Sequence, residues 1–230
     1  MTIFEKLYLG RSPHLIILDL DGTLIDSAPD LAKAANIMLE RLNREFVSIE
    51  QVRQWVGDGA YMLVTRLLAR RLEVHELERK EAEVHSTALN YFLAAYGECC
   101  AEETVLYPGV FESLNEWCAK EIRLACVTNK PIQHTETLLN KFKLRDLMST
   151  VIGGDSLPAK KPDPLPLMYA MEKNVVDKNH TLMIGDSKTD VLSARSAQIP
   201  IVCVSYGYNH GNRIEDENPD FVVNSLLEIR

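Results

Sequence analysis

Residues 14–24 read His-Leu-Ile-Ile-Leu-Asp-Leu-Asp-Gly-Thr-Leu. The apolar run from Leu15 to Leu18 predicts a short strand that is buried on both faces, and Asp19 marks the point where that strand ends. Asp21-Gly22 is a common turn dipeptide. A buried strand that leads directly into a polar turn is typical of a parallel sheet, because helices cover both faces of such a sheet.

Further apolar runs of the same kind follow later in the chain, and helical patterns separate them. This alternation predicts an α/β fold with a Rossmann-like parallel sheet of about five or six strands. The last run is expected to form an edge strand. The expected strands are 14–19, 122–128, 149–153, 180–185, 200–204 and 221–223, and the expected helices are 110–120, 131–142, 164–173 and 187–197.

The stretch from about residue 27 to about residue 106 has a different pattern, with helical periodicity and no strand-like run. Ser48-Ile-Glu-Gln51 is a capping box that opens one helix, and Gly97 is expected to end another. Roughly eighty residues are far more than a single crossover needs. We therefore predict an α/β core from 1–24 and 107–230, with an all-helical insertion at 25–106; the alternative is that these helices pad the core. The expected helices are 31–42, one from 48, 60–72 and about 75–96.

The composition excludes several classes of protein. The chain has 230 residues, 46% hydrophobic and 25% charged, which is close to an average soluble protein and unlike a disordered or collagen-like chain. The net charge of −8 argues against nucleic-acid binding through a basic surface. An anionic ligand would therefore need a local cation, from a side chain or a metal ion.

The chain shows no apolar run long enough to cross a membrane, so we expect no membrane partner. Glu5 and Lys6 interrupt the apolar run that a signal peptide would need. The five cysteines form no C-x-x-C pair, and Cys126 and Cys203 are expected in the core. We predict a cytoplasmic protein that is a monomer or a homodimer.

Polar residues follow three of the expected strands. Asp19, Thr128 and Asp186 each come at a strand's carboxyl end, where open α/β sheets have their ligand crevice. Each signal has an ordinary alternative: Asp21-Gly22 after Asp19 is a common turn, Thr128 could be one more strand residue, and Asp186 could cap the helix that starts near Ser187. Their joint occurrence favours a shared site.

Four segments resemble the signatures of the haloacid dehalogenase superfamily, in that family's order. They are Asp19-Leu-Asp-Gly-Thr-Leu-Ile-Asp-Ser27, Thr128-Asn129, Lys161-Pro-Asp-Pro164 and Gly185-Asp-Ser-Lys-Thr-Asp190. The helical insertion resembles the cap that this superfamily carries after its first signature. Within the superfamily, the runs Asp26–Leu31 and Val56–Ala60 are similar to those of phosphoglycolate phosphatases.

This resemblance implies Mg²⁺-dependent hydrolysis of a phosphate ester. It assigns Asp19 as the nucleophile that forms an aspartyl-phosphate, and Asp21 as the acid that protonates the leaving group and then the base that activates water. Asp19, Asp186, Asp190 and the main-chain carbonyl of Asp21 are the implied Mg²⁺ ligands, either directly or through water. A solvated helix residue is the alternative for Asp190. Because a halide leaves without a proton, Asp21 argues for phosphate chemistry rather than dehalogenation.

The resemblance also implies the residues that hold the phosphate. Lys161 is expected to bridge Asp19 and the phosphate, since the family's lysine directly precedes its proline; the neighbouring Lys160 leaves an ambiguity of one position, and a solvated basic pair is the alternative. The Thr128 hydroxyl and the Asn129 main-chain N–H are expected to bind phosphoryl oxygens. Lys130 is expected either to add positive charge there or to remain in solvent.

The insertion should select the substrate. The break Gly57-Asp58-Gly59 is expected to bring backbone close to the substrate, so these three residues are candidate substrate-binding residues. Arg66 could reach a small carboxylate, although a surface helix arginine is the more ordinary interpretation.

We therefore predict a phosphatase of a small phosphorylated metabolite, with 2-phosphoglycolate as the preferred candidate. The alternatives in the same superfamily are a sugar- or amino-sugar-phosphate phosphatase, a pyrophosphatase and a phosphomutase. The alternative of another class is a regulator that binds a phosphate ligand without turnover.

Overall fold

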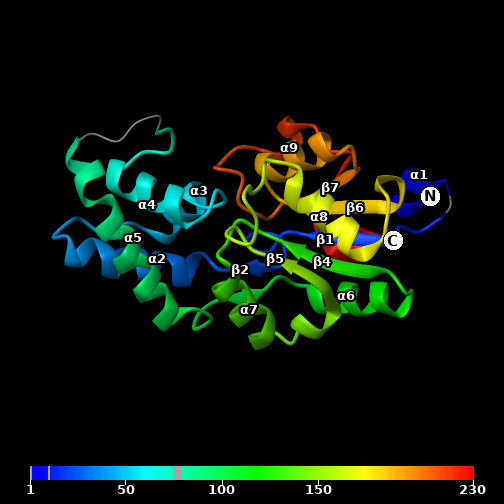
Figure 1. The fold of residues 1–230 in the computed structure, drawn as a ribbon, viewed down its shortest axis with the longest axis horizontal. Helices are drawn as coiled ribbons and strands as arrows, with labels where there is room; N and C mark the ends of the chain where they lie inside the picture. Colours follow the sequence, from blue (N-terminus) through cyan, green and yellow to red (C-terminus); the bar gives the residue numbers. More distant parts are fainter. Residues whose placement is uncertain (1, 10, 75–78) are drawn as a thin grey trace.

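The computed structural model describes residues 2–9, 11–74 and 79–230. Its centre is a parallel sheet in the order β5-β4-β1-β6-β7-β8, which confirms the predicted α/β class (Figure 1). All six expected strands are present, and the last lies at an edge of the sheet as predicted. The strands are β1 (Leu15–Leu18), β4 (Arg123–Val127), β5 (Met148–Ile152), β6 (Thr181–Gly185), β7 (Ile201–Val204) and β8 (Phe221–Val223).

Helices cover both faces of this sheet, because alternate residues of each strand point to opposite sides. Ile16 and Leu18 pack with α1, α6 and α7 on one face, whereas Leu15 and Ile17 pack with α8 and α9 on the other. The buried Cys126 and Cys203 lie in β4 and β7, as predicted. These helices are α1 (Ile3–Tyr8), α6 (Val110–Ala119), α7 (Ile132–Lys141), α8 (Leu165–Asn174) and α9 (Lys188–Ala197).

The segment between β1 and α6 contains a group of helices that pack mainly against one another around their own apolar cluster, beside the sheet (Figure 1). The chain enters this segment through β2 and returns through β3, and these two short strands pair antiparallel. We refer to this segment as the helical insertion; its exact limits as a domain stay a prediction. Its elements are β2 (Ile25–Asp26), α2 (Ala28–Arg41), α3 (Ile49–Trp55), α4 (Ala60–Ala69), α5 (Arg79–Cys99) and β3 (Val105–Leu106).

Two helix ends in the insertion differ from prediction. Helix α4 ends at Ala69 rather than near residue 72, and α5 continues through Gly97 to Cys99. Buried Tyr96 and Cys99 on either side of Gly97 keep packing against the insertion, and this packing outweighs the roughly 1 kcal/mol by which glycine disfavours a helix. The predicted start of this helix, at 75–78, lies outside the described residues.

Short 3₁₀ helices complete the connections; they span Arg145–Leu147, Lys178–His180, Ile214–Glu217 and Leu226–Glu228. Among the described helices, none has both the length and the apolar character that crossing a bilayer requires.

Candidate active site

The three polar residues at strand ends meet at one edge of the sheet. Asp19, Thr128 and Asp186 directly follow β1, β4 and β6, and β1 lies between the other two strands. Leu18 is in register with Cys126 and Ile184, and β4 and β6 end one residue later, so the residues that follow the three strands emerge within one residue of the same level. The parallel topology therefore explains why segments far apart in the sequence converge here.

Lys161 lies at the centre of this site. Its Nζ is 2.7 Å from Oδ1 of Asp19 and 2.7 Å from Oδ1 of Asp190, and the residue is 3% exposed. Burial alone lowers the pKa of Lys161, but the two carboxylates outweigh this effect and raise the pKa above its ordinary value. Lys160 points elsewhere and donates to the carbonyl of Asp58 at 2.6 Å. The solvated-pair interpretation of these two lysines is therefore wrong.

Asp186 is fixed by donors on both of its oxygens. Thr23 Oγ1 donates to Oδ1 at 2.7 Å, and the Tyr208 main-chain N–H donates to Oδ2 at 2.6 Å. Gly22 closes the same pocket with a φ of +88°, and a Cβ there would lie 2.2 Å from Oδ2 of Asp186. The turn after β1 therefore requires glycine both for its backbone conformation and for this close approach.

Asp190 is a buried part of the site and not a solvated helix residue. It is 0% exposed, and its Oδ2 accepts hydrogen bonds from the Ser187 hydroxyl at 2.7 Å and from the main-chain N–H of Asp186 at 3.2 Å. Ser187, rather than Asp186, is the N-cap of α9, and Asp190 completes the capping box. The carboxyl group of Asp186 is thus left for the site.

Three carboxylates gather in this site, and Lys161 contacts two of them, Asp19 and Asp190. Oxygens of Asp19, Asp186 and Asp190 lie within 4.8 Å of one another, and all three residues are buried. Burial raises the pKa of Asp19 to about 6 despite the opposing charge of Lys161, and burial together with the charges of Asp19 and Asp190 raises the pKa of Asp186 well above its ordinary value. Oxygen ligands that are short of positive charge fit a hard divalent cation such as Mg²⁺.

We expect Mg²⁺ to stabilise the fold more at about pH 7.5 than at about pH 5. The pKa of Asp19 rises from 3.8 to about 6 on folding, so its ionisation costs stability as the pH rises through this window, and the cost is complete above it. Above the pKa of Asp19, a bound cation offsets the cost of ionising this carboxylate. Below that pKa, the cation has to compete with protons for it. At saturating Mg²⁺ the melting temperature should rise by about 5 °C or more at the higher pH and by under about 2 °C at the lower.

Thermal unfolding with and without Mg²⁺ measures this effect independently of activity. Asp186→Asn should abolish most of the Mg²⁺-dependent rise at the higher pH, whereas Asp146→Asn, which changes an exposed carboxylate outside the site, should leave it intact. Equal rises at both pH values in the unmodified protein would contradict a proton-linked metal site at these carboxylates.

The side chain of Asp21 points away from the three carboxylates. Both of its oxygens lie 2.9 Å from Nζ of Lys130, and Oδ1 accepts the hydroxyl of Ser27. Lys130 is buried and also lies 4.7 Å over the ring of Tyr96. The interpretation of Lys130 as a solvent-exposed lysine is therefore wrong, because it positions the predicted acid–base residue. The carboxylate of Asp21 remains free of the proposed metal site.

Thr128 and Asn129 are both buried beside Asp19, at the end of β4. The hydroxyl of Thr128 accepts the main-chain N–H of Lys130 at 3.2 Å, which leaves the hydroxyl's own proton for a phosphoryl oxygen. The side-chain amide of Asn129 donates to the carbonyl of Lys161 at 3.0 Å and to that of Gly57 at 3.2 Å. Asn129 therefore ties the lysine segment to the helical insertion.

The loop Gly57-Asp58-Gly59 contacts the core. Gly59 has a φ of +87°, and a Cβ there would lie 2.9 Å from the carbonyl oxygen of Asn129. The Asp58 carboxylate lies 2.5 Å from Arg66 and accepts the Thr189 hydroxyl at 3.1 Å.

His210 adds a further contact to this carboxylate, at 3.4 Å. Burial alone would raise the pKa of Asp58, but its hydrogen bonds to His210 and Arg66 lower it below its ordinary value. Asp58 therefore connects the insertion to the core as a carboxylate.

Arg66 is not the surface arginine that its helical position suggested. It is 8% exposed, and its guanidinium donates to the carbonyl of Trp55 at 2.6 Å as well as to Asp58. Arg66 stabilises the loop from within the insertion, and it is not among the described residues that line the cavity next to Asp19.

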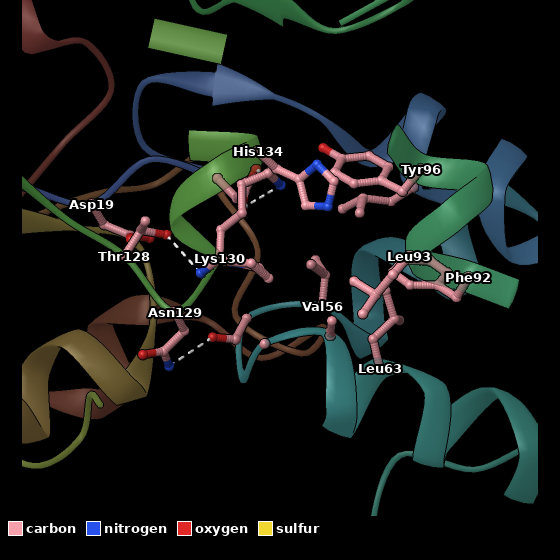
Figure 2. A pocket seen from close by; sticks show the side chains of 16 residues that line it. Asp19, Val56, Leu63, Phe92, Leu93, Tyr96, Thr128, Asn129, Lys130 and His134 are labelled. Atoms are coloured by element: carbon pink, nitrogen blue, oxygen red, sulfur yellow. Dashed lines mark hydrogen bonds and ion pairs between the residues drawn. The ribbon is translucent and has the colours of Figure 1, made fainter. Parts of the chain in front are cut away.

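A cavity of about 40 Å³ lies between the core and the insertion (Figure 2). Asp19, Thr128 and Lys130 line its core side. Its opposite wall is apolar and comes from α2, α4, α5 and the loop before α4; that wall consists of Leu31, Val56, Gly57, Gly59, Ala60, Leu63, Phe92, Leu93 and Tyr96. The insertion thus closes the space in front of the predicted nucleophile.

Several residues of the site were not predicted from the sequence. Thr23 lies within the first signature, so its position could have signalled its contact with Asp186. Ser27, Tyr208 and His134 carry no such signal, because they reach the site only through tertiary packing.

Comparisons with known proteins agree with these features. Residues 16–204 match the family described as haloacid dehalogenase-like hydrolases. The chain is 46% identical over 227 residues to a phosphoglycolate phosphatase of Pseudomonas fluorescens, covering 98% of this chain and 82% of that protein. It is 43% identical to a phosphoglycolate phosphatase of Nitrosococcus oceani, covering 96% of each chain.

A solved structure shares the whole architecture. The crystal structure of a predicted phosphoglycolate phosphatase from Haemophilus somnus superposes with a TM-score of 0.87 at 35% identity, covering 96% of this chain and 97% of that one. The similarity thus extends over the helical insertion as well as the sheet.

Proposed function

The chain belongs to the haloacid dehalogenase-like hydrolase family, and from this premise we propose that it is a Mg²⁺-dependent phosphatase that hydrolyses 2-phosphoglycolate to glycolate and phosphate. The observation that carries the proposal is the contact of Lys161 with Asp19, beside the carboxylates of Asp186 and Asp190. This arrangement supports phosphoryl transfer, which depends mainly on positioning and on charge stabilisation.

In the first step, a carboxylate oxygen of Asp19 attacks phosphorus, and the bond from phosphorus to the ester oxygen breaks. The leaving oxygen takes a proton from Asp21. In the second step, Asp21 takes a proton from water, and the resulting hydroxide attacks the aspartyl-phosphate, which releases phosphate and restores Asp19. Lys130 holds the carboxylate of Asp21 in place through contacts with both of its oxygens.

Lys161 and the hydroxyl of Thr128 would stabilise the negative charge on the transferring phosphoryl group, together with the main-chain N–H of Asn129. Asp19, Asp186 and the main-chain carbonyl of Asp21 would hold Mg²⁺, and Asp190 would act directly or through a water molecule. When bound, Mg²⁺ supplies positive charge that offsets the repulsion between a carboxylate and a phosphate dianion.

The size of the cavity supports a small leaving group. A volume of about 40 Å³ holds about three water molecules, which suits glycolate better than a sugar or an amino sugar. Gly57 and Gly59 line the cavity and are the proposed contacts from the loop. Asp58, predicted as a substrate-binding residue, would act indirectly, because its carboxylate already holds the loop to the core.

A panel of phosphorylated metabolites tests this function through the ratio kcat/KM. With Mg²⁺ we expect 2-phosphoglycolate to exceed sugar 6-phosphates, amino-sugar 6-phosphates and pyrophosphate by at least about 10-fold in this ratio. A phosphomutase would retain phosphate on its organic product. Tight binding without release of phosphate from any compound would instead favour the regulatory alternative and contradict catalysis.

A further inference from the structure

The cavity beside Asp19 contains few polar groups that are free to recognise a second charge on the substrate. Among the described lining residues, Thr128 and Asn129 face the predicted phosphate site, and Asp19 and Asp21 are acidic. Lys130 already contacts both oxygens of Asp21. Among the described lining residues, the remaining side-chain donors are the hydroxyl of Tyr96, which is buried without a hydrogen-bond partner, and the imidazole of His134.

His134 lines the same cavity from α7 and is 7% exposed. Its imidazole extends toward Tyr96 of the insertion, and the two rings meet edge to face with their centroids 4.9 Å apart (Figure 2). Within residues 2–9, 11–74 and 79–230, no hydrogen bond involves either ring nitrogen of His134.

The ring nitrogens of His134 are not among the fully enclosed polar atoms of the described residues, so a molecule in the cavity can reach them. A polar group at a largely apolar site gains free energy from a hydrogen-bond partner. The imidazole of His134 lies at a cavity that has room for a small ligand, and the wall from the insertion is apolar apart from the hydroxyl of Tyr96. The partner missing from the protein can therefore be supplied by a bound molecule.

We propose that His134 is a specificity-determining residue, whose ring N–H donates a hydrogen bond to the carboxylate of the substrate. This role of His134 rests on the proposed phosphatase function. It implies that the substrates of the enzyme are small phosphate monoesters that carry a carboxylate. The phosphate would lie against Asp19 and Lys161, and the carboxylate would point along the cavity toward α7 and α5.

The surroundings of His134 suit this role. The groups that act on it are Lys130, Asp21, Asp155 and the ring of Tyr96. Burial, reinforced by the charge of Lys130, lowers the pKa of His134, so the imidazole is neutral near pH 7 and offers one N–H donor. Lys130 adds positive potential on the same side of the cavity, and the apolar wall limits screening by water.

A pair of substrates that differ only in this group tests the proposal. One is 2-phosphoglycolate, and the other is 2-hydroxyethyl phosphate, in which a hydroxymethyl group replaces the carboxylate. The full chain with Mg²⁺ should prefer 2-phosphoglycolate in kcat/KM. His134→Phe should reduce this preference by about 10- to 100-fold through a higher KM, with 2-hydroxyethyl phosphate little affected.

Two further variants distinguish recognition from packing. His134→Gln keeps a side-chain N–H donor and should restore part of the preference, whereas Gln133→Leu, an exposed change on the same helix, should leave it unchanged. Activity of every variant on 2-hydroxyethyl phosphate reports that the fold is intact.

If wild-type protein prefers 2-phosphoglycolate and His134→Phe retains that preference, the role of His134 is overturned while the proposed function stands. If wild-type protein does not distinguish the two substrates, the carboxylate specificity fails together with the proposed substrate. Phosphate release from neither compound would overturn the proposed function itself.

Discussion

Replacing Asp19 by asparagine is expected to lower kcat on 2-phosphoglycolate by at least about 1,000-fold. An amide oxygen is a poor nucleophile toward phosphorus, and the variant would also lose a charged ligand for Mg²⁺ and an ionic partner of Lys161. Steady-state release of phosphate at saturating Mg²⁺ measures the loss. Rapid acid quenching followed by intact-mass measurement should find a phosphorylated form of the wild-type chain and none of the variant.

The same substitution should leave the fold in place, which separates lost chemistry from lost structure. Asp19 is one of three crowded carboxylates, and burial raises its pKa to about 6, so a neutral side chain there relieves repulsion. Lys161 keeps its contact with Asp190. Without Mg²⁺ we expect the melting temperature of Asp19→Asn to equal or exceed that of wild type. Full turnover by this variant would contradict the nucleophile assignment.

The sheet and its three strand-end residues could be predicted because local sequence encodes them. Short apolar runs that end in Asp19, Thr128 and Asp186 define three strands, and the parallel topology then dictates that these ends are adjacent. The helical insertion was also recognisable from its periodicity, although Gly97 was wrongly taken as the end of a helix. There the tertiary packing of Tyr96 and Cys99 overrides a local signal.

The contacts that complete the site depend on tertiary structure, and no pattern in the local sequence predicts them. Asp58 is held by Arg66 of its own insertion and by Thr189 and His210 of the core, three residues that no spacing rule connects. Lys130 follows two signature residues and had no distinguishing feature in the sequence, yet it is buried against Asp21. The choice of Lys161 over Lys160, by contrast, rested on its position before Pro162, and Lys161 is the lysine that contacts Asp19.

Asp21→Asn is expected to lower kcat/KM on 2-phosphoglycolate by about 1,000-fold, and the loss should depend on the leaving group. Glycolate departs as a strongly basic alkoxide and needs a proton, which asparagine cannot supply. Acetyl phosphate is a compound of similar size whose leaving group, acetate, is stable without a proton. Phosphorylation of Asp19 by acetyl phosphate should therefore survive in the variant within about 10-fold. Asp146→Asn is the matched control, because it removes an exposed carboxylate.

The second step separates the two roles of Asp21. Water must lose a proton to attack the aspartyl-phosphate, whichever substrate formed it, so Asp21→Asn should slow this step for both compounds. With acetyl phosphate the variant should release one equivalent of acetate rapidly and then turn over slowly, whereas 2-phosphoglycolate should give no burst. Equal losses on both substrates without a burst would contradict the acid role. Retained steady-state turnover of acetyl phosphate by the variant would contradict the base role, for which Lys130 holds the carboxylate in place at 2.9 Å from both of its oxygens.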